Sequence, residues 1–291
     1  MLAGVWGALA DPWSQTILQR AAAEVILLGI VGGLLGCWLV FYELSYGAES
    51  LAHALFPGLV IAALAGFPLL LGGAIGLVVA SLGVAAVGRI PQIGRDTAVA
   101  IVVTTLLGLG ALLALSSDSP PGIQGLMFGD ILGFTTLDLG LAAGLATIVI
   151  VALAVLHTRL LAVGFDRSAA RRLGASTALA DVAILVLLAA SILVAVQGLG
   201  NLLVVAVLIG PAATARLVAR RMGAMMAWAA AIAVLAGVGG LYLSYYARIA
   251  AGASIALVIV GGYLVVASAA AAGRRSPPMP WARPWSPRAR S

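Results

Sequence analysis

The sequence has no lysine, one cysteine and few charged residues of any kind. Only 9% of its 291 residues are charged, and all sixteen basic residues are arginines. Without lysine the chain can form neither a phosphate-binding P-loop nor a Schiff base. The single Cys37 excludes an intrachain disulfide, and its apolar surroundings indicate a packing residue. If ATP powers this protein, another subunit must therefore supply the ATPase.

Apolar residues dominate the composition of the chain. They account for 63% of the chain, and the mean hydropathy is +1.16, far above the range of soluble globular proteins. Because about 20 apolar residues cross a bilayer as a helix, we expect an all-α polytopic membrane protein with about eight to nine transmembrane helices. The candidate spans are 21–41, 48–66, 68–87, 98–115, 137–156, 178–196, 199–215, 225–245 and 250–272.

The arginines lie between these spans in an uneven way. If the C-terminus is cytoplasmic, the inward connections carry fourteen of the sixteen, and only Arg20 and Arg248 face outward. Positive residues favour the cytoplasmic side, so we expect the N-terminus outside and interpret the pI near 10.2 as topology rather than nucleic-acid binding. Residues 1–20 are then an extracytoplasmic or interfacial segment, 21–272 the transmembrane domain, and 273–291 a disordered cytoplasmic tail that can bind anionic lipid.

Two ionisable residues interrupt the second candidate span. Glu49 and His53 are four residues apart and share one face of a helix. Such groups are costly in a bilayer unless they are paired or line a polar pathway. A carboxylate oxygen with an imidazole nitrogen suits Mn²⁺, Fe²⁺ or Zn²⁺, so the pair is a candidate metal site. The alternative is a Glu–His hydrogen bond that only ties two helices together.

The inward connection at 164–174 has the pattern of a short helix. Asp166 can cap its N-terminus and Gly174 can end it. Three arginines are expected to face solvent or a partner: Arg167, Arg171 and Arg172. An ordinary positively charged loop with a short surface helix explains the same residues. His157, just before this connection, is expected at an inner helix end beside Arg159, with a structural role.

Three aspartates occur around the outward segment before the fifth span. They are Asp118, Asp130 and Asp138. Together they would present an acidic rim to a docking protein or to incoming cations. Helix capping and ordinary solvation account for them as well.

Several stretches taken together resemble the zinc/manganese/iron permease subunits of bacterial ABC importers. The stretches follow the order and spacing of that family, and the resemblance extends from about residue 12 to residue 266. They lie at 49–58, 94–101, 126–133, 169–174 and 203–215. Members of the family typically have Asp where this chain has Glu49. Corrinoid and siderophore permeases share the same broad architecture, that of type II importers.

The resemblance implies a function and a set of partners. The chain would be the permease of an ABC importer for Zn, Mn or Fe, in a multi-pass bacterial plasma-membrane complex, with no permanent cofactor and no covalent chemistry of its own. Its partners would be a second permease copy, two ATPase subunits and an extracytoplasmic metal-binding lipoprotein. Glu49 and His53 would hold the ion. The coupling residues would be Asp166, Arg167, Ala170, Arg171, Leu173 and Gly174.

Three other functions compete with this interpretation. A siderophore or corrinoid permease would have no use for the Glu–His pair. A carrier or channel coupled to ions would need no ATPase and gives no reason for the 169–174 stretch. An intramembrane metalloenzyme would need about three protein ligands at its metal, which one Glu and one His do not supply.

Overall fold

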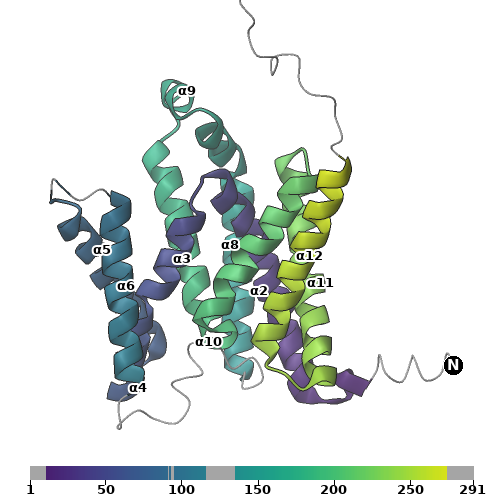
Figure 1. Ribbon diagram of the computed structural model, residues 1–291. Helices are drawn as coiled ribbons and strands as arrows, with labels where there is room; N and C mark the ends of the chain where they lie inside the picture. The colour runs from purple at the N-terminus through teal and green to yellow at the C-terminus, as the bar shows by residue number, and fades with distance from the viewer. Residues whose placement is uncertain (1–10, 91, 93–94, 116–134, 274–291) are drawn as a thin grey trace, which may run out of the picture.

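The computed structural model describes residues 11–90, 92, 95–115 and 135–273, and every regular element among them is helical (Figure 1). The elements are η1 (Asp11–Ser14), α2 (Thr16–Phe41), α3 (Ser45–Ala54), α4 (Phe56–Ala65), α5 (Leu69–Val87), α6 (Arg95–Ala114), α8 (Thr136–Phe165), α9 (Arg167–Arg172), α10 (Thr177–Val218), α11 (Met222–Ala247) and α12 (Ala251–Gly273). Residues 1–10 of the expected N-terminal segment 1–20 and residues 274–291 of the expected tail 273–291 lie outside the described residues.

Eight helical segments of the described chain are long and apolar enough to cross a membrane. One shorter apolar helix, Leu203–Val218, follows the sixth of them. This confirms the predicted all-α membrane fold and its eight to nine spans. The short helix corresponds to the predicted span 199–215.

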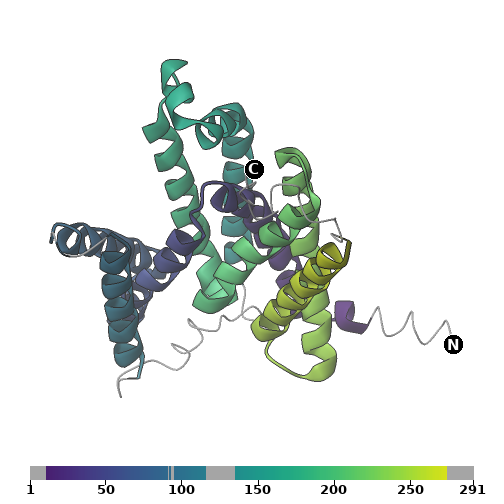
Figure 2. The same ribbon diagram turned by 45° about the horizontal axis from the view of Figure 1, so that its top comes forward.

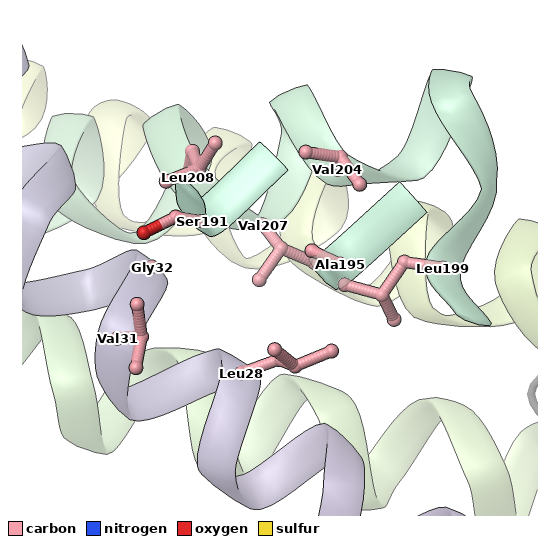
Figure 3. Close-up of a pocket in the computed structure, with 9 residues that line it drawn as sticks. All are labelled: Leu28, Val31, Gly32, Ser191, Ala195, Leu199, Val204, Val207 and Leu208. Atoms are coloured by element: carbon pink, nitrogen blue, oxygen red, sulfur yellow. The ribbon is translucent and has the colours of Figure 1, made fainter. Parts of the chain in front are cut away.

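The predicted turn between the sixth and seventh spans is a break inside α10. Gly200 has φ 73° and ψ 161°, a conformation that only glycine adopts readily. In Figure 3, Val204 lies near Leu199 and Leu208 lies near Ser191, so the two halves of α10 run in opposite directions. A single glycine therefore reverses the chain inside the bundle.

Helix α2 lies at the centre of the main bundle and packs most extensively against α11 and α10 (Figure 1). Glycines allow this close approach, because a Cβ at Gly33 would lie 2.7 Å from the backbone carbon of Ala229 in α11. Small residues are the usual means by which membrane helices pack closely. Helices α4, α5 and α6 form a separate group beside this bundle, and α3 connects the two (Figures 1 and 2).

The helices differ from the predicted spans most clearly at three places. Helix α2 begins at Thr16 rather than at residue 21, and α8 continues to Phe165 rather than ending near residue 156. Hydropathy marks the apolar stretch of a helix, but a helix continues into the polar interface when its backbone hydrogen bonds can continue. The second span is divided after Leu55, where Pro57 occupies the first turn of α4, a position that requires no backbone N–H.

The arginines of the described residues gather at one end of the helices, which also carries α9 (Figure 1). Among the described arginines, only Arg20 and Arg248 belong to the opposite end, near the start of α2 and the end of α11. At the end with α9 the arginines are Arg89, Arg95, Arg159, Arg167, Arg171, Arg172, Arg216, Arg220 and Arg221. We call this the arginine-rich end below.

Candidate functional site

The Glu–His pair lies on α3, the helix between the main bundle and the α4–α6 group. Glu49 Oε1 and His53 Nε2 are 4.0 Å apart, so the two side chains share one helix face as expected. The Glu49 side chain is 54% exposed and that of His53 is 18% exposed. The positions that flank the pair on α3 are buried, with Ala48 and Ala52 fully covered. The Glu49 carboxylate is thus exposed on a helix that is packed on both flanking positions, while His53 is largely covered.

The pair alone is an incomplete metal site. Among the described residues, no group of three or more His, Cys, Asp or Glu side chains is arranged to hold a metal ion. One carboxylate and one imidazole leave at least two positions of a four-coordinate ion to other ligands. Because Glu49 is exposed, those positions are open on the side that faces away from the chain.

Two cavities in the described structure do not provide an alternative site. The first, of about 10 Å³, lies between α2 and the two halves of α10, and Figure 3 shows its lining. It has room for about one water, and its one polar side chain, Ser191, donates its hydroxyl to Leu187 O at 2.7 Å. The second, of about 140 Å³, is lined by apolar residues and glycines of α4, α5 and α6 and by Phe67. Neither cavity offers side chains that bind a cation.

Helix α9 has both of its ends closed by hydrogen bonds. Asp166 Oδ1 accepts from the backbone N–H groups of Ser168 at 2.8 Å and Ala169 at 3.0 Å. These bonds, together with one from the Ser168 hydroxyl, favour the carboxylate and lower the pKa of Asp166, with the Ala169 bond as the largest cause. At the other end, the N–H of Ala175 donates to Ala170 O at 2.9 Å, and Gly174 has φ 81°. The predicted N-cap and C-terminal glycine are confirmed.

The side chains of α9 divide into a buried and an exposed set. Ala170 is buried against the bundle, while Arg171 and Arg172 are exposed. Two large apolar side chains beside them are also exposed, Leu173 by 84% and Phe165 by 78%. A short helix with basic and apolar side chains on its free surface suits a protein partner. The coupling role itself stays a prediction.

Arg167, which was expected to face solvent or a partner, is half exposed and also pairs with a residue of this chain. Its two terminal nitrogens each donate to one carboxylate oxygen of Asp181 in α10, both at 2.9 Å. The guanidinium carbon also lies 5.9 Å from the ring centroid of Tyr42, the residue after α2. No sequence pattern connects positions 42, 167 and 181, so this cluster could only be found in the structure.

Of the three aspartates of the predicted acidic rim, Asp138 alone lies among the described residues. Asp118 and Asp130 lie outside the described residues. Asp138 caps α8, where its Oδ2 accepts from Thr135 N at 2.9 Å and its N–H donates to Thr135 Oγ1 at 3.3 Å. Its hydrogen bonds are those of a capping box. A docking role for these residues stays a prediction.

Two groups in the main bundle were missed or misplaced by sequence reasoning. Glu24 in α2 is 1% exposed, and neither of its carboxyl oxygens has a hydrogen-bond partner in the described structure. An ionisable residue inside a candidate span was the signal that could have found it. His157 lies inside α8 rather than at its end, and its ring packs edge-on against Trp38 at 5.4 Å between centroids.

The chain matches the family model described as "ABC 3 transport family" over residues 14–270. It is 31% identical to the manganese transport system membrane protein MntC of Halalkalibacterium halodurans, over 84% of each chain. It is 30% identical to the manganese import system permease protein ScaB of Streptococcus gordonii, covering 85% of this chain and 89% of that one. It is also 30% identical to a probable iron transport system membrane protein of Haemophilus influenzae, covering 90% and 96%.

A solved structure has the same fold. The structure described as PsaBC from Streptococcus pneumoniae in complex with Fab matches with a TM-score of 0.83 and 27% identity, covering 91% of this chain and 95% of that one. The family model, the relatives and the helical fold agree with one another. This chain is therefore a member of the ABC 3 transport family, the membrane permeases of metal-importing ABC systems.

Proposed function

We propose that this chain imports a divalent transition metal across the bacterial plasma membrane by ATP-driven alternating access. The relatives named above are manganese and iron transport proteins, and oxygen and nitrogen ligands without a thiolate suit these ions. The observation that carries the proposal is the Glu49–His53 pair on one face of α3, with the Glu49 carboxylate exposed.

A second copy of the chain completes the metal site in this proposal. A two-fold axis beside α3 would bring two Glu49 and two His53 side chains to one point, which gives four ligands. Such a site holds an ion loosely enough to release it, as transport requires. Glu49 has one methylene more than the aspartate typical of the family, so it reaches further toward the axis and changes the size of the site.

The two ends of the bundle receive different partners. We place the arginine-rich end in the cytoplasm, following the positive-inside rule, with the N-terminus outside. The two ATPase subunits of the complex then bind one to each permease copy, at α9, through Arg171, Arg172 and the exposed Leu173. A metal-binding lipoprotein delivers the ion at the opposite end, where Asp138 lies. ATP hydrolysis takes place in the separate subunits, and this chain carries out no covalent chemistry.

The test is uptake of labelled Mn²⁺, Fe²⁺ and Zn²⁺ into cells that express the chain with and without its ATPase. We expect one metal to enter only with the ATPase, and Glu49→Ala or His53→Ala to abolish its uptake at matched expression. Glu49→Asp should retain uptake, and Tyr46→Phe, an exposed position on the same helix, serves as the control.

Three outcomes would contradict the proposal. If both alanine variants take up metal like the wild type, the pair only ties helices together and the ion passes elsewhere. If uptake continues without the ATPase, the protein is an ion-coupled carrier or channel. Uptake of a metal chelate with no uptake of the bare ion would favour the siderophore or corrinoid class.

A further inference from the structure

Arg167 and its two partners, Asp181 and Tyr42, connect four helices. Arg167 begins α9, its partner Asp181 belongs to α10, and Tyr42 follows the last residue of α2. The Tyr42 hydroxyl in turn donates to Leu160 O in α8 at 2.9 Å. We propose that Arg167 is a positioning residue that transmits movement of α9 to α3, the helix with Glu49 and His53, through Asp181 and Tyr42. This inference rests on the proposed function.

The contact with α10 fixes both the position and the direction of the side chain. Two parallel hydrogen bonds of 2.9 Å join the Arg167 guanidinium to the Asp181 carboxylate. A paired contact of this kind resists rotation as well as separation, which a lysine ammonium cannot do. The side chains are 51% and 36% exposed, so the pair adds little to overall stability. The pair instead links the positions of two helices, because a displacement of α9 also displaces the first turns of α10.

The contact with Tyr42 connects the same guanidinium to α2 and α8. The guanidinium carbon is 5.9 Å from the Tyr42 ring centroid, within the range of a cation–π contact. Burial is the largest effect on the pKa of the Tyr42 phenol and raises it; Asp181 also raises this pKa, and Arg167 lowers it. The phenol thus keeps its proton and continues to donate to Leu160 O. Tyr42 is held by its ring on one side and by its hydroxyl on the other.

A tight turn leads from Tyr42 to the helix with the metal ligands. The N–H of Tyr42 donates to Trp38 O at 2.9 Å, and the N–H of Leu44 donates to Leu39 O at 2.8 Å. Glu43 between them has φ 59°, in the left-handed region that closes such helix ends. Because α3 begins at Ser45, directly after this turn, it cannot pivot freely about the end of α2.

Helix α9 is suited to move as one body. It has only six residues, Asp166 caps its start, and the bond from Ala175 to Ala170 closes its end. A partner that pulls on the exposed Leu173 or Arg171 therefore moves Arg167 with it. The sequence of contacts then runs from Arg167 to Tyr42 and from Tyr42 to α3.

The experiment uses the full permease with its ATPase in lipid nanodiscs. Cys37 is replaced by alanine and Tyr46 in α3, which is 53% exposed, is replaced by cysteine and labelled with an environment-sensitive dye. In this background we measure the ATP-dependent change in dye emission, ATPase activity and metal uptake. The variants are Arg167→Lys, Asp181→Asn and the exchange Arg167→Asp with Asp181→Arg. The control is Arg159→Lys, an exposed arginine of α8 with no ion pair in the described structure.

We expect both single variants to abolish the emission change and to lower metal uptake at least tenfold. Their ATPase activity should stay within about twofold of the wild type. The exchanged pair should recover a large part of both, and the control should match the wild type. Single variants that keep the emission change and the uptake would overturn the inference. So would an ATPase activity that falls in proportion to uptake, because the pair would then only hold the fold. A wild type without ATP-dependent uptake would instead contradict the proposed function.

Discussion

A methyl group on Gly33 tests how closely α2 packs against α11. A Cβ at this position would lie 2.7 Å from Ala229 C and from Ala230 N, whereas ordinary contacts begin at 3.4 Å, so α11 must retreat by about 0.7 Å. A gap of this size forfeits roughly a quarter to a half of the dispersion attraction of the atoms concerned. Overpacking of this kind typically costs about 1–3 kcal/mol. Gly33→Ala should therefore destabilise the protein, although alanine favours a helix by roughly 0.5–1 kcal/mol.

The matched control lies one turn earlier on the same helix and faces the same partner. A Cβ at Gly29 would meet Ala233 C at 3.4 Å, which is ordinary van der Waals contact. Gly29→Ala should then be neutral or slightly stabilising. Thermal unfolding of the purified protein in one detergent measures both variants. A net cost of about 2 kcal/mol would lower the Tm by roughly 4–8 °C for a chain of this size.

The comparison between the two variants decides the outcome. If Gly33→Ala and Gly29→Ala unfold at the same temperature, the close backbone contact of α2 with α11 does not limit stability. If both are stabilising, helix propensity outweighs packing here, and the reasoning from the Cβ distances is wrong.

Three further predictions concern single residues. Glu24→Leu should raise the Tm by a few degrees, because it removes buried carboxyl oxygens that have no hydrogen-bond partner, a cost of about 1–3 kcal/mol; a loss of uptake at unchanged or higher Tm would instead assign Glu24 a role in transport. Glu43→Gly should stabilise the turn before α3 by about 1 kcal/mol in the same assay, since Glu43 has φ 59°. The lowered pKa of Asp166 means that its capping contribution is present above its unfolded pKa, near 3.8, and is lost as the pH falls through the folded value. Hydrogen-exchange protection of α9 should therefore fall below about pH 4, and Asp166→Ala should remove that pH dependence.

The helices could be predicted from the sequence because hydropathy dominates in a membrane protein. Apolar stretches of about 20 residues located the spans, and the spacing of Glu49 and His53 placed both on one face of α3. The boundaries of α8 could not be predicted in the same way, since Arg159 and Gly164 interrupt the apolar pattern but not the helix. A turn was expected between the sixth and seventh spans. That one residue, Gly200, makes this turn depends on its backbone angles, which the amino-acid composition does not predict.

The contacts between distant segments could not be predicted at all. Arg167 was expected to face solvent or a partner because arginines at inward connections usually do. Its pairing with Asp181 depends on how α9 folds back onto α10, and its contact with Tyr42 depends on where α2 ends. Such contacts follow from tertiary packing, and the periodic patterns of a single sequence do not predict them.

The central place of α2 has a consequence for the synthesis of this protein. Helix α2 leaves the ribosome well before its main neighbours α10 and α11, which begin more than 130 residues later. At ordinary rates of translation this delay is on the order of ten seconds. During that time the Glu24 carboxyl and the glycine face of α2 lack the helices that later cover them. The insertion machinery or the lipid must cover this face of α2 until α10 and α11 are inserted. A chain that stops before α10 therefore leaves α2 without its main packing partners.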